Sequence, residues 1–240
     1  MQKLFVDFVP QGIVTLDEER SRHIAKSLRM RVGDMLTLSA GDGKDYGCII
    51  ESIDSKNVTL KVCYEQVCDS EPSVRVTLYQ GVPKGDKLED IIQKCCELGI
   101  YEIQPVLTHR SVSRPDEKSA AKKQARYQKI ALEAAQQSGR GIVPCVNLMT
   151  ELKNAITNDD SELKILFYEG GGEALTNMIK KDVKSISVYI GPEGGFEQAE
   201  VELIKSSGGK IATLGKRILR TQTAPIAALT SIMLLTGNLE

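Results

Sequence analysis

The chain has 240 residues, of which 41% are hydrophobic and 26% are charged, and its formal net charge is −1. These values are ordinary for a globular protein with one large domain or two small ones, and they exclude a polycationic protein. No apolar run approaches the roughly 18 residues that a membrane helix needs, so no membrane partner is expected.

The N-terminal stretch MQKLFVDFVP has acidic Asp7 among its apolar residues and is followed by no small-residue cleavage site. It is therefore typical of a first strand and not of a signal peptide. The six cysteines form no C-x-x-C pair, and the chain has only two histidines. This composition favours buried cysteines in a reducing, cytoplasmic protein over a metal site or a disulfide framework.

Residues 35–65 have the pattern of a β-meander. The apolar stretches MLTLSA, YGCIIESI and VTLKVCYE are separated by the turn-forming stretches GDGKD and DSKN. Before the meander, HIAKSLRM has apolar residues at helical spacing. The polar stretch at 66–73, QVCDSEPS, breaks the pattern and is predicted to be a linker. The sequence thus predicts a small, mostly β domain over residues 1–70.

Strands and helices alternate over residues 74–240, which predicts an α/β domain with a largely parallel sheet covered on both faces. The helix DKLEDIIQKCCEL has apolar residues at i, i+3, i+4 and i+7 and begins with a capping-box-like pair, Asp86 and Glu89. The expected strands are 74–82, 100–107, 163–169, 185–190 and 210–214; the expected helices are 86–98, one that ends at Gly139, 173–181, 197–206 and one that starts near Pro225.

Three of the expected strand ends carry unusual loops, FYEGGGE (167–173), IGPEGGF (190–196) and LGKRILRTQTAP (214–225). Ligands bind at such ends in parallel sheets. None of the loops is a dinucleotide-binding or P-loop motif, and three carboxylates, Glu169, Glu173 and Glu193, would repel a phosphate. A ligand with a positive centre, or one bound through backbone groups, suits the loops better. The alternatives are glycine turns without a ligand and, from the glycines alone, a nucleotide-phosphate enzyme.

Five stretches together resemble one family: GPEGGF, LGKRILRTQTA, KGDKLEDIIQKCCELGI, KIALEAAQQSGR and HIAKSLRMRVGD. They are similar to motifs of the 16S ribosomal RNA (uridine-N3) methyltransferase family, a branch of the SPOUT superfamily. The resemblance implies a PUA-like, RNA-binding β-barrel over 1–70 and a SPOUT methyltransferase domain with a trefoil knot over 74–240. It also implies a homodimer that uses S-adenosylmethionine to methylate N3 of a specific uridine in 16S ribosomal RNA of the small subunit.

Carried onto this chain, the resemblance implies a cofactor pocket in the three loops. The residues expected to bind the cofactor are Tyr168, Glu169, Ile190, Gly191, Pro192, Glu193, Gly194, Gly195, Leu214, Gly215, Ile218, Leu219 and Arg220.

Two residues are candidates for catalysis. Negative charge spreads onto the carbonyl oxygens of uracil as N3 loses its proton, and the guanidinium of Arg220 suits that charge; a structural ion pair or a phosphate contact is the alternative. Glu193 and solvent are the candidate proton acceptors; alternatively, Glu193 holds its loop by accepting backbone N–H bonds. Gln222 stands where the family usually has Glu and cannot accept a proton at neutral pH. We expect Gln222 to hydrogen-bond near the start of the last helix; the alternative is a non-catalytic RNA-binding protein that kept the fold.

Basic residues gather in three stretches of this nearly neutral chain, which suggests an anionic partner. His109, near one of these stretches, is expected to be structural. Aromatic residues are scarce, so base stacking is not expected to carry much affinity. The candidate phosphate contacts, which would position RNA without reading its sequence, are Arg22, Lys26, Arg29, Arg31, Lys84, Lys87, Arg110, Arg114 and Arg140.

Overall fold

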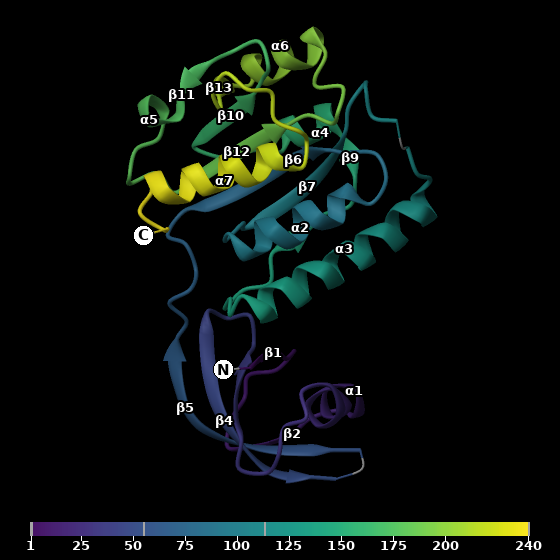
Figure 1. Cartoon of the computed structure of the whole chain (residues 1–240), viewed down its shortest axis with the longest axis vertical. Helices are drawn as coiled ribbons and strands as arrows, with labels where there is room; N and C mark the ends of the chain where they lie inside the picture. The colour runs from purple at the N-terminus through teal and green to yellow at the C-terminus, as the bar shows by residue number, and fades with distance from the viewer. Residues whose placement is uncertain (1, 55, 113, 240) are drawn as a thin grey trace. The chain divides into compact units, whose positions relative to one another are not determined.

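The computed structural model describes residues 2–54, 56–112 and 114–239, which form two compact units (Figure 1). The first unit consists of the chain as far as Glu71 together with Ala135–Val143, and the second of Pro72–Ala134 together with the chain from Pro144 onward. The described part contains no helix that is long and apolar enough to cross a membrane.

The first unit is built around a five-stranded mixed sheet. Its elements are β1 (Lys3–Phe5), β2 (Ile13–Thr15), α1 (Glu18–Arg22), the π-helical turn η1 (His23–Ser27), β3 (Met35–Ser39), β4 (Lys44–Ile53) and β5 (Val58–Val67). The strand order is β1-β3-β4-β5-β2, with β1 parallel to β3 and the other pairs antiparallel. The predicted meander is confirmed, and its alternating apolar residues form one core with Ile24 of η1.

The helical segment of this unit differs from the regular helix that its spacing predicts. It begins as α1, where the Asp17 side chain accepts a hydrogen bond from the Arg20 backbone nitrogen at 2.8 Å. It then widens into the π-turn η1 and ends near Arg29, whose φ of 54° lies in the left-handed region. Non-glycine residues rarely adopt this conformation. The short helix therefore ends within the basic stretch.

The second unit is built around an eight-stranded, parallel sheet. Its strands are β6 (Arg75–Gly81), β7 (Glu102–Leu107), β8 (Cys145–Val146), β9 (Thr150–Glu151), β10 (Leu163–Phe167), β11 (Glu173–Ala174), β12 (Ser185–Ile190) and β13 (Lys210–Thr213). The order is β11-β13-β10-β12-β6-β7-β8, with β9 also paired to β7. Every pair is parallel, so the predicted parallel α/β unit is confirmed.

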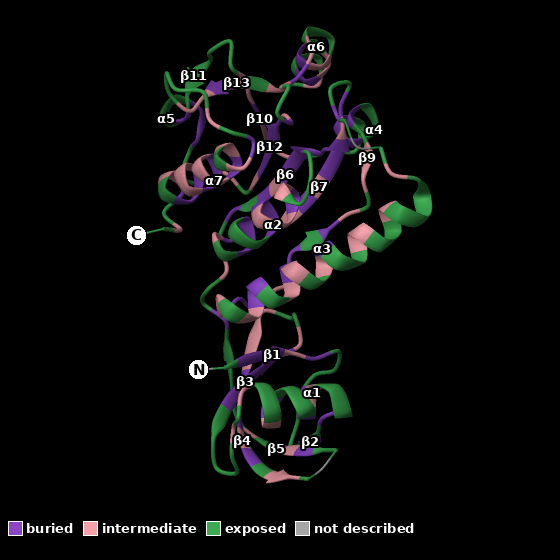
Figure 2. Cartoon of the chain, turned by 45° about the vertical axis from the view of Figure 1, so that its right-hand side comes forward, coloured by how far each residue is buried: buried purple, intermediate pink, exposed green. Residues whose placement is uncertain are grey.

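Helices cover both faces of this sheet. They are α2 (Lys87–Glu97), α3 (Glu117–Gln137), α4 (Leu152–Thr157), α5 (Leu175–Met178), α6 (Gln198–Ser206) and α7 (Thr223–Leu235). On one face, α4 and α6 pack on a buried cluster that includes Tyr79, Leu166 and Tyr189. On the other, α7 packs on β6 and β12 and against α2. Buried residues therefore line both sides of the central strands (Figure 2).

Two local predictions differ from the structure. Asp86 makes no side-chain cap bond at α2, and the Glu89 carboxylate pairs with Arg126 of α3 at 2.7 Å. The helix expected at 173–181 is reduced to α5, because Glu173 and Ala174 pair with β13 as the edge strand β11. Both differences come from partners far away in the sequence.

Candidate functional site

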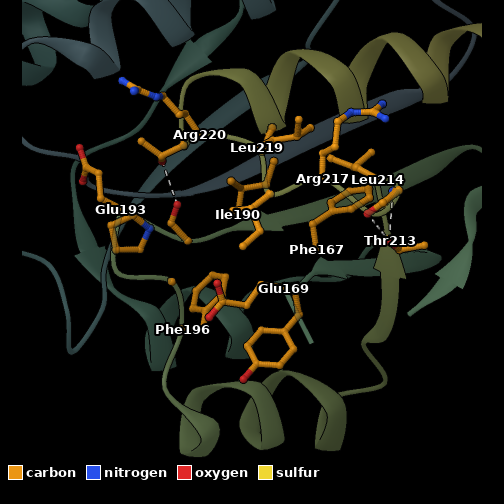
Figure 3. A pocket seen from close by; sticks show the side chains of 18 of the residues that line it. Phe167, Glu169, Ile190, Glu193, Phe196, Thr213, Leu214, Arg217, Leu219 and Arg220 are labelled. Atoms are coloured by element: carbon orange, nitrogen blue, oxygen red, sulfur yellow. Dashed lines mark hydrogen bonds between the residues drawn. The ribbon is translucent and has the colours of Figure 1, made fainter. Parts of the chain in front are cut away.

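Three neighbouring strands of the second unit, β13, β10 and β12, end at the same edge of the sheet. Because they are parallel, their carboxyl ends bring together the loops 168–172, 191–197 and 214–222. Between these loops lies a cavity of about 650 Å³ (Figure 3). This volume is within the range of roughly 300–1,000 Å³ of small-molecule and cofactor sites.

The cavity is lined by all the residues expected to bind a cofactor except Gly194. Gly194 lies at the loop's other side, where its carbonyl oxygen accepts a hydrogen bond from Arg110 at 2.6 Å. Phe167 and Phe196 could have been found by including the last residue of each strand and motif. The residues that sequence reasoning missed are Lys87, Phe167, Gly171, Phe196, Ala212, Thr213, Lys216, Arg217, Thr221, Gln222 and Ala224.

The GPEGGF loop folds tightly on itself beside the cavity. A Cβ on Gly191 would lie 3.0 Å from the Cα of Gly195, closer than nearly all real contacts. Gly195 has a φ of 67° and closes a turn by donating its N–H to the Pro192 carbonyl oxygen at 2.9 Å. Glycine is the residue that adopts this conformation without strain. The glycines therefore allow close backbone packing and leave the loop's polar groups at the cavity wall.

A short hydrogen-bond chain joins two of the loops to the end of β6. The Thr221 hydroxyl donates to the Gly191 carbonyl oxygen at 2.9 Å and accepts from the Gln80 side-chain amide at 3.1 Å. Gln80 is fully buried and Thr221 nearly so. Buried polar groups are costly when unpaired, so this chain fixes the loop 214–222 against Gly191.

The chain of hydrogen bonds gives a first prediction. Replacing Thr221 by valine keeps the shape but removes the hydroxyl. Two buried hydrogen bonds are lost, at about 0.5–1.5 kcal/mol each, while the Gln80 amide keeps its longer bond to the Gly191 carbonyl oxygen at 3.4 Å. We expect a lower melting temperature and weaker cofactor binding for Thr221→Val, and near-wild-type values for Thr221→Ser. Thermal unfolding and calorimetry measure both. Equal stability of the valine and serine variants would contradict the role given to the hydroxyl.

Glu193 is held by the residues that precede and begin α2. Its carboxylate lies 2.6 Å from the Lys87 Nζ and accepts a hydrogen bond from the Lys84 backbone nitrogen at 3.2 Å. Partial burial by itself raises the pKa of Glu193, but the hydrogen bond from Lys87, the backbone N–H bonds and the charge of Lys87 together lower it below the usual value. A carboxylate held in its ionised form is a weak proton acceptor, so this geometry favours a structural role.

The lowered pKa of Glu193 predicts a pH dependence. A group whose pKa is lower in the folded state stabilises the protein above its unfolded pKa, and this contribution is lost as the pH falls through the folded value. We expect wild type and Glu193→Gln to differ in stability at neutral pH and to converge under acid conditions below the usual carboxyl pKa. The variant should also bind the cofactor more weakly, by at most about fivefold, because a partly exposed ion pair contributes roughly 0.2–1 kcal/mol. Chemical denaturation across pH measures the difference; a pH-independent difference would contradict the assignment.

Arg220 lies on the cavity wall, and its exposed guanidinium has no ion pair or hydrogen bond among the described residues. In Figure 3 its side chain extends toward the side where Glu193 lies, while Arg217 extends to the opposite side. The arginine is thus available to a ligand. Gln222 also lines the cavity, but it makes no side-chain cap bond at α7. The hydrogen bond expected for Gln222 at the helix start is therefore absent from the described structure.

The candidate phosphate contacts fall into two groups. Lys26, Arg29, Arg31 and Lys84 are exposed, and their side chains have no partner among the described residues. The other candidates make ion pairs or carbonyl contacts, as Lys87 does with Glu193. Arg22 pairs with Glu18 at 2.8 Å, and Arg114 pairs with Glu151 at 2.9 Å. His109, with Nδ1 2.9 Å from Glu197, takes part in the same kind of surface contact.

Arg140 differs from the other candidates because it is buried, with 3% of its surface exposed. Its guanidinium lies 2.6 Å from the Glu71 carboxylate, which also accepts the backbone N–H of Gly141 at 2.9 Å. The expected phosphate contact is therefore replaced by a structural one, since a guanidinium in this position presents almost no surface to RNA. Within the first unit, Arg140 fixes residues 139–142 to the end of the linker.

Comparisons with known proteins agree with this architecture. A family model described as an RNA methyltransferase domain matches residues 70–233, and one described as an RNA methyltransferase PUA domain matches residues 16–63. The first match covers more than half of the chain, so the chain belongs to the RNA methyltransferase family.

Its relatives define the class more narrowly. The chain is 35% identical to the ribosomal RNA small subunit methyltransferase E of Bacillus subtilis, over 97% of this chain and 96% of that protein. It also resembles the structure of a ribosomal RNA small subunit methyltransferase E from Neisseria gonorrhoeae bound to S-adenosyl methionine, with 32% identity, a TM-score of 0.90 and 98% of each chain covered. A Legionella pneumophila structure in complex with the same cofactor has 29% identity and a TM-score of 0.87, with 97% of this chain and 96% of that chain covered.

Proposed function

We propose that this protein transfers a methyl group from S-adenosylmethionine to N3 of a specific uridine in 16S ribosomal RNA of the small subunit. The observation that carries the proposal is a glycine-walled cavity at the carboxyl ends of β10, β12 and β13 with the unpaired guanidinium of Arg220 at its wall. The relatives named above, two of them bound to the same cofactor, support it.

The residues of the cavity fit this cofactor. Ile190, Phe196, Leu214 and Leu219 supply apolar walls for a planar base. Gly191 and Gly195, which also line the cavity, let the backbone approach the cofactor closely. The Glu169 carboxylate also lines the cavity and suits a cation better than a phosphate. When bound, S-adenosylmethionine supplies an electrophilic methyl group on a positively charged sulfur.

The chain's own residues then have distinct tasks. N3 of uracil faces its pairing partner in a duplex, so the base must be unpaired or extruded to reach the cavity. The Arg220 guanidinium donates hydrogen bonds to the carbonyl oxygens of uracil, where negative charge develops as N3 loses its proton to solvent. Glu193, tied to Lys87, holds the GPEGGF loop in shape. Alignment of the two reacting groups is the main catalytic contribution.

The finer architecture belongs to the same proposal. The first unit is a PUA-like β-barrel that binds RNA, and the second a SPOUT domain with a trefoil knot. The path of the chain after β13 supports the knot. β13 lies beyond β10 in the sheet, but the loop 214–222 that follows it returns to Gly191 and Gln80. The chain then continues into α7, which packs on β6 and β12. An electron-density trace of residues 214–222 tests the threading.

The free cysteines suit a cytoplasmic location, which cell fractionation checks.

We also propose a homodimer that uses the outer face of α7. Ala227, Thr230, Ser231 and Leu234 share this face, and Leu234 is 60% exposed. The Ser231 hydroxyl donates to the Ala227 carbonyl oxygen at 2.8 Å, which leaves the face with few polar groups to hydrate. Light scattering should give a dimer for wild type and a monomer for Leu234→Glu; a monomeric wild type would exclude this interface.

Two experiments test the function. Calorimetry with S-adenosylmethionine and with ATP should give binding only for the first; ATP binding alone would remove the proposal. Transfer of a labelled methyl group onto small subunits that lack the modification should give incorporation. Cofactor binding without incorporation would favour the alternative that Gln222 raises, a non-catalytic RNA-binding protein that kept the fold.

A further inference from the structure

The outer side of α3 carries a straight line of lysines. Lys118, Lys122 and Lys129 lie within about 40° of one another around a helix of 3.6 residues per turn. The opposite side, with Tyr127 and Ala131, is buried. We call the three lysines the basic stripe; all three are exposed. Figure 2 shows exposed residues at intervals along α3.

The charges of the basic stripe are largely uncompensated. Lys118 and Lys122 have no ion pair or hydrogen bond among the described residues, and Lys129 only reaches Glu133 at 4.0 Å. The acidic residues of the helix, Glu117 and Glu133, lie at or beyond the ends of the stripe. Acids three or four residues away along a helix partly neutralise a lysine. No acid stands at those positions from Lys118 or Lys122, so this part of the helix concentrates positive charge.

The helix that carries the stripe is fixed to the second unit. Gln124 donates to the Val146 carbonyl oxygen at 2.9 Å, and Gln128 donates to the Pro144 carbonyl oxygen at 3.0 Å. Gln128 also accepts the Val146 N–H at 2.9 Å, and Arg126 pairs with Glu89 of α2. These contacts use the flanks of α3 and leave the stripe free. The lysines therefore stand on a rigid support.

We propose that the basic stripe binds the phosphate backbone of an RNA double helix. The stripe spans about 16 Å at a rise of 1.5 Å per residue, and the short side chains of Ala121 and Ala125 beside it allow close approach. Its exposed side has no aromatic residue on which unpaired bases could stack, so a duplex, with its phosphates outward, suits it better than a single strand. The inference rests on the proposed function only in taking RNA as the partner.

Binding of the full-length protein to RNA duplexes, followed by fluorescence anisotropy at several salt concentrations, tests the stripe. The variant Lys118→Gln/Lys122→Gln/Lys129→Gln is compared with Lys153→Gln/Lys180→Gln/Lys181→Gln, which removes the same charge from exposed lysines of the same unit. Each lost phosphate contact should reduce the slope of log affinity against log salt by about 0.7–0.9. We expect a reduction of roughly 2–3 for the stripe variant alone, equal for duplexes of unrelated sequence, because phosphates carry no sequence information.

Two further readouts keep the result specific. Cofactor affinity should match wild type in both triple variants, which shows that the second unit is folded. In methyl transfer, the stripe variant should raise KM for the RNA and leave kcat unchanged. Equal slopes for the stripe and control variants would overturn the proposal, as would a loss confined to single-stranded RNA or to an acidic protein. The anisotropy experiment measures RNA binding without methyl transfer. A negative result in it would therefore overturn the basic stripe alone, and a lack of methyl transfer would overturn the proposed function alone.

Discussion

Replacing Arg220 by alanine is expected to lower methyl transfer to ribosomal RNA by about 10²- to 10³-fold, the loss typical of removing one donor that stabilises developing negative charge. The guanidinium has no protein partner among the described residues, so its removal breaks no ion pair that holds the fold. We therefore expect the melting temperature and the dimer to be unchanged. Single-turnover transfer of a labelled methyl group measures the effect.

Two controls separate catalysis from binding. Cofactor affinity of Arg220→Ala, measured by calorimetry, should change much less than the rate, because the effect belongs to the transition state. Arg220→Lys keeps the charge but loses the planar pair of donors, and it should recover only part of the activity. A fully active Arg220→Ala would show that the assignment is wrong. A loss of rate that is matched by an equal loss of cofactor affinity would move Arg220 from catalysis to cofactor binding.

Replacing Gly191 by valine is expected to weaken cofactor binding by about 10- to 100-fold, equivalent to the roughly 1–3 kcal/mol of an overpacked site. Even a single Cβ at this position would lie 3.0 Å from both backbone carbons of Gly195. The valine methyl groups would push the GPEGGF loop outward and enter the cavity. Gly191→Ala should have a smaller effect of the same sign.

Calorimetry measures the affinity, and thermal unfolding reports whether the rest of the unit is intact. The GPEGGF loop and the loop 214–222 are joined by the hydrogen bond from the Thr221 hydroxyl to the Gly191 carbonyl oxygen, and we expect a modest fall in the melting temperature. Wild-type cofactor affinity in Gly191→Val would contradict the placement of the cofactor between these loops. Loss of folding would leave Gly191→Ala as the informative variant, in which unchanged affinity would be equally contradictory.

Local patterns predicted the parts of the fold that depend on neighbours in the sequence. The alternation of strands and helices predicted the parallel sheet, and the three unusual strand ends predicted the residues of the cavity wall. Local patterns did not predict the role of Arg140. Its buried partner, Glu71, lies 69 residues away, and no periodicity reports a contact of that kind. A basic residue in a polar stretch has the same local pattern whether it faces solvent or a carboxylate.

Glu193 shows the same limit within the site itself. The sequence placed its carboxylate in the loop but left open whether it accepts a proton or holds the loop. The distinction depends on Lys87 and on the Lys84 N–H, more than 100 residues earlier in the chain. These groups meet because β6 and β12 are adjacent in the sheet. The order of the strands, which the sequence pattern did not predict, therefore determines the role of the residue.

Mass mapping of methylated uridines in 16S ribosomal RNA from cells with and without this gene tests the proposed function most directly. We expect one N3-methyluridine that is present with the gene, absent without it, and restored by wild type but not by Arg220→Ala. An identical set of methylated uridines in both strains would contradict it.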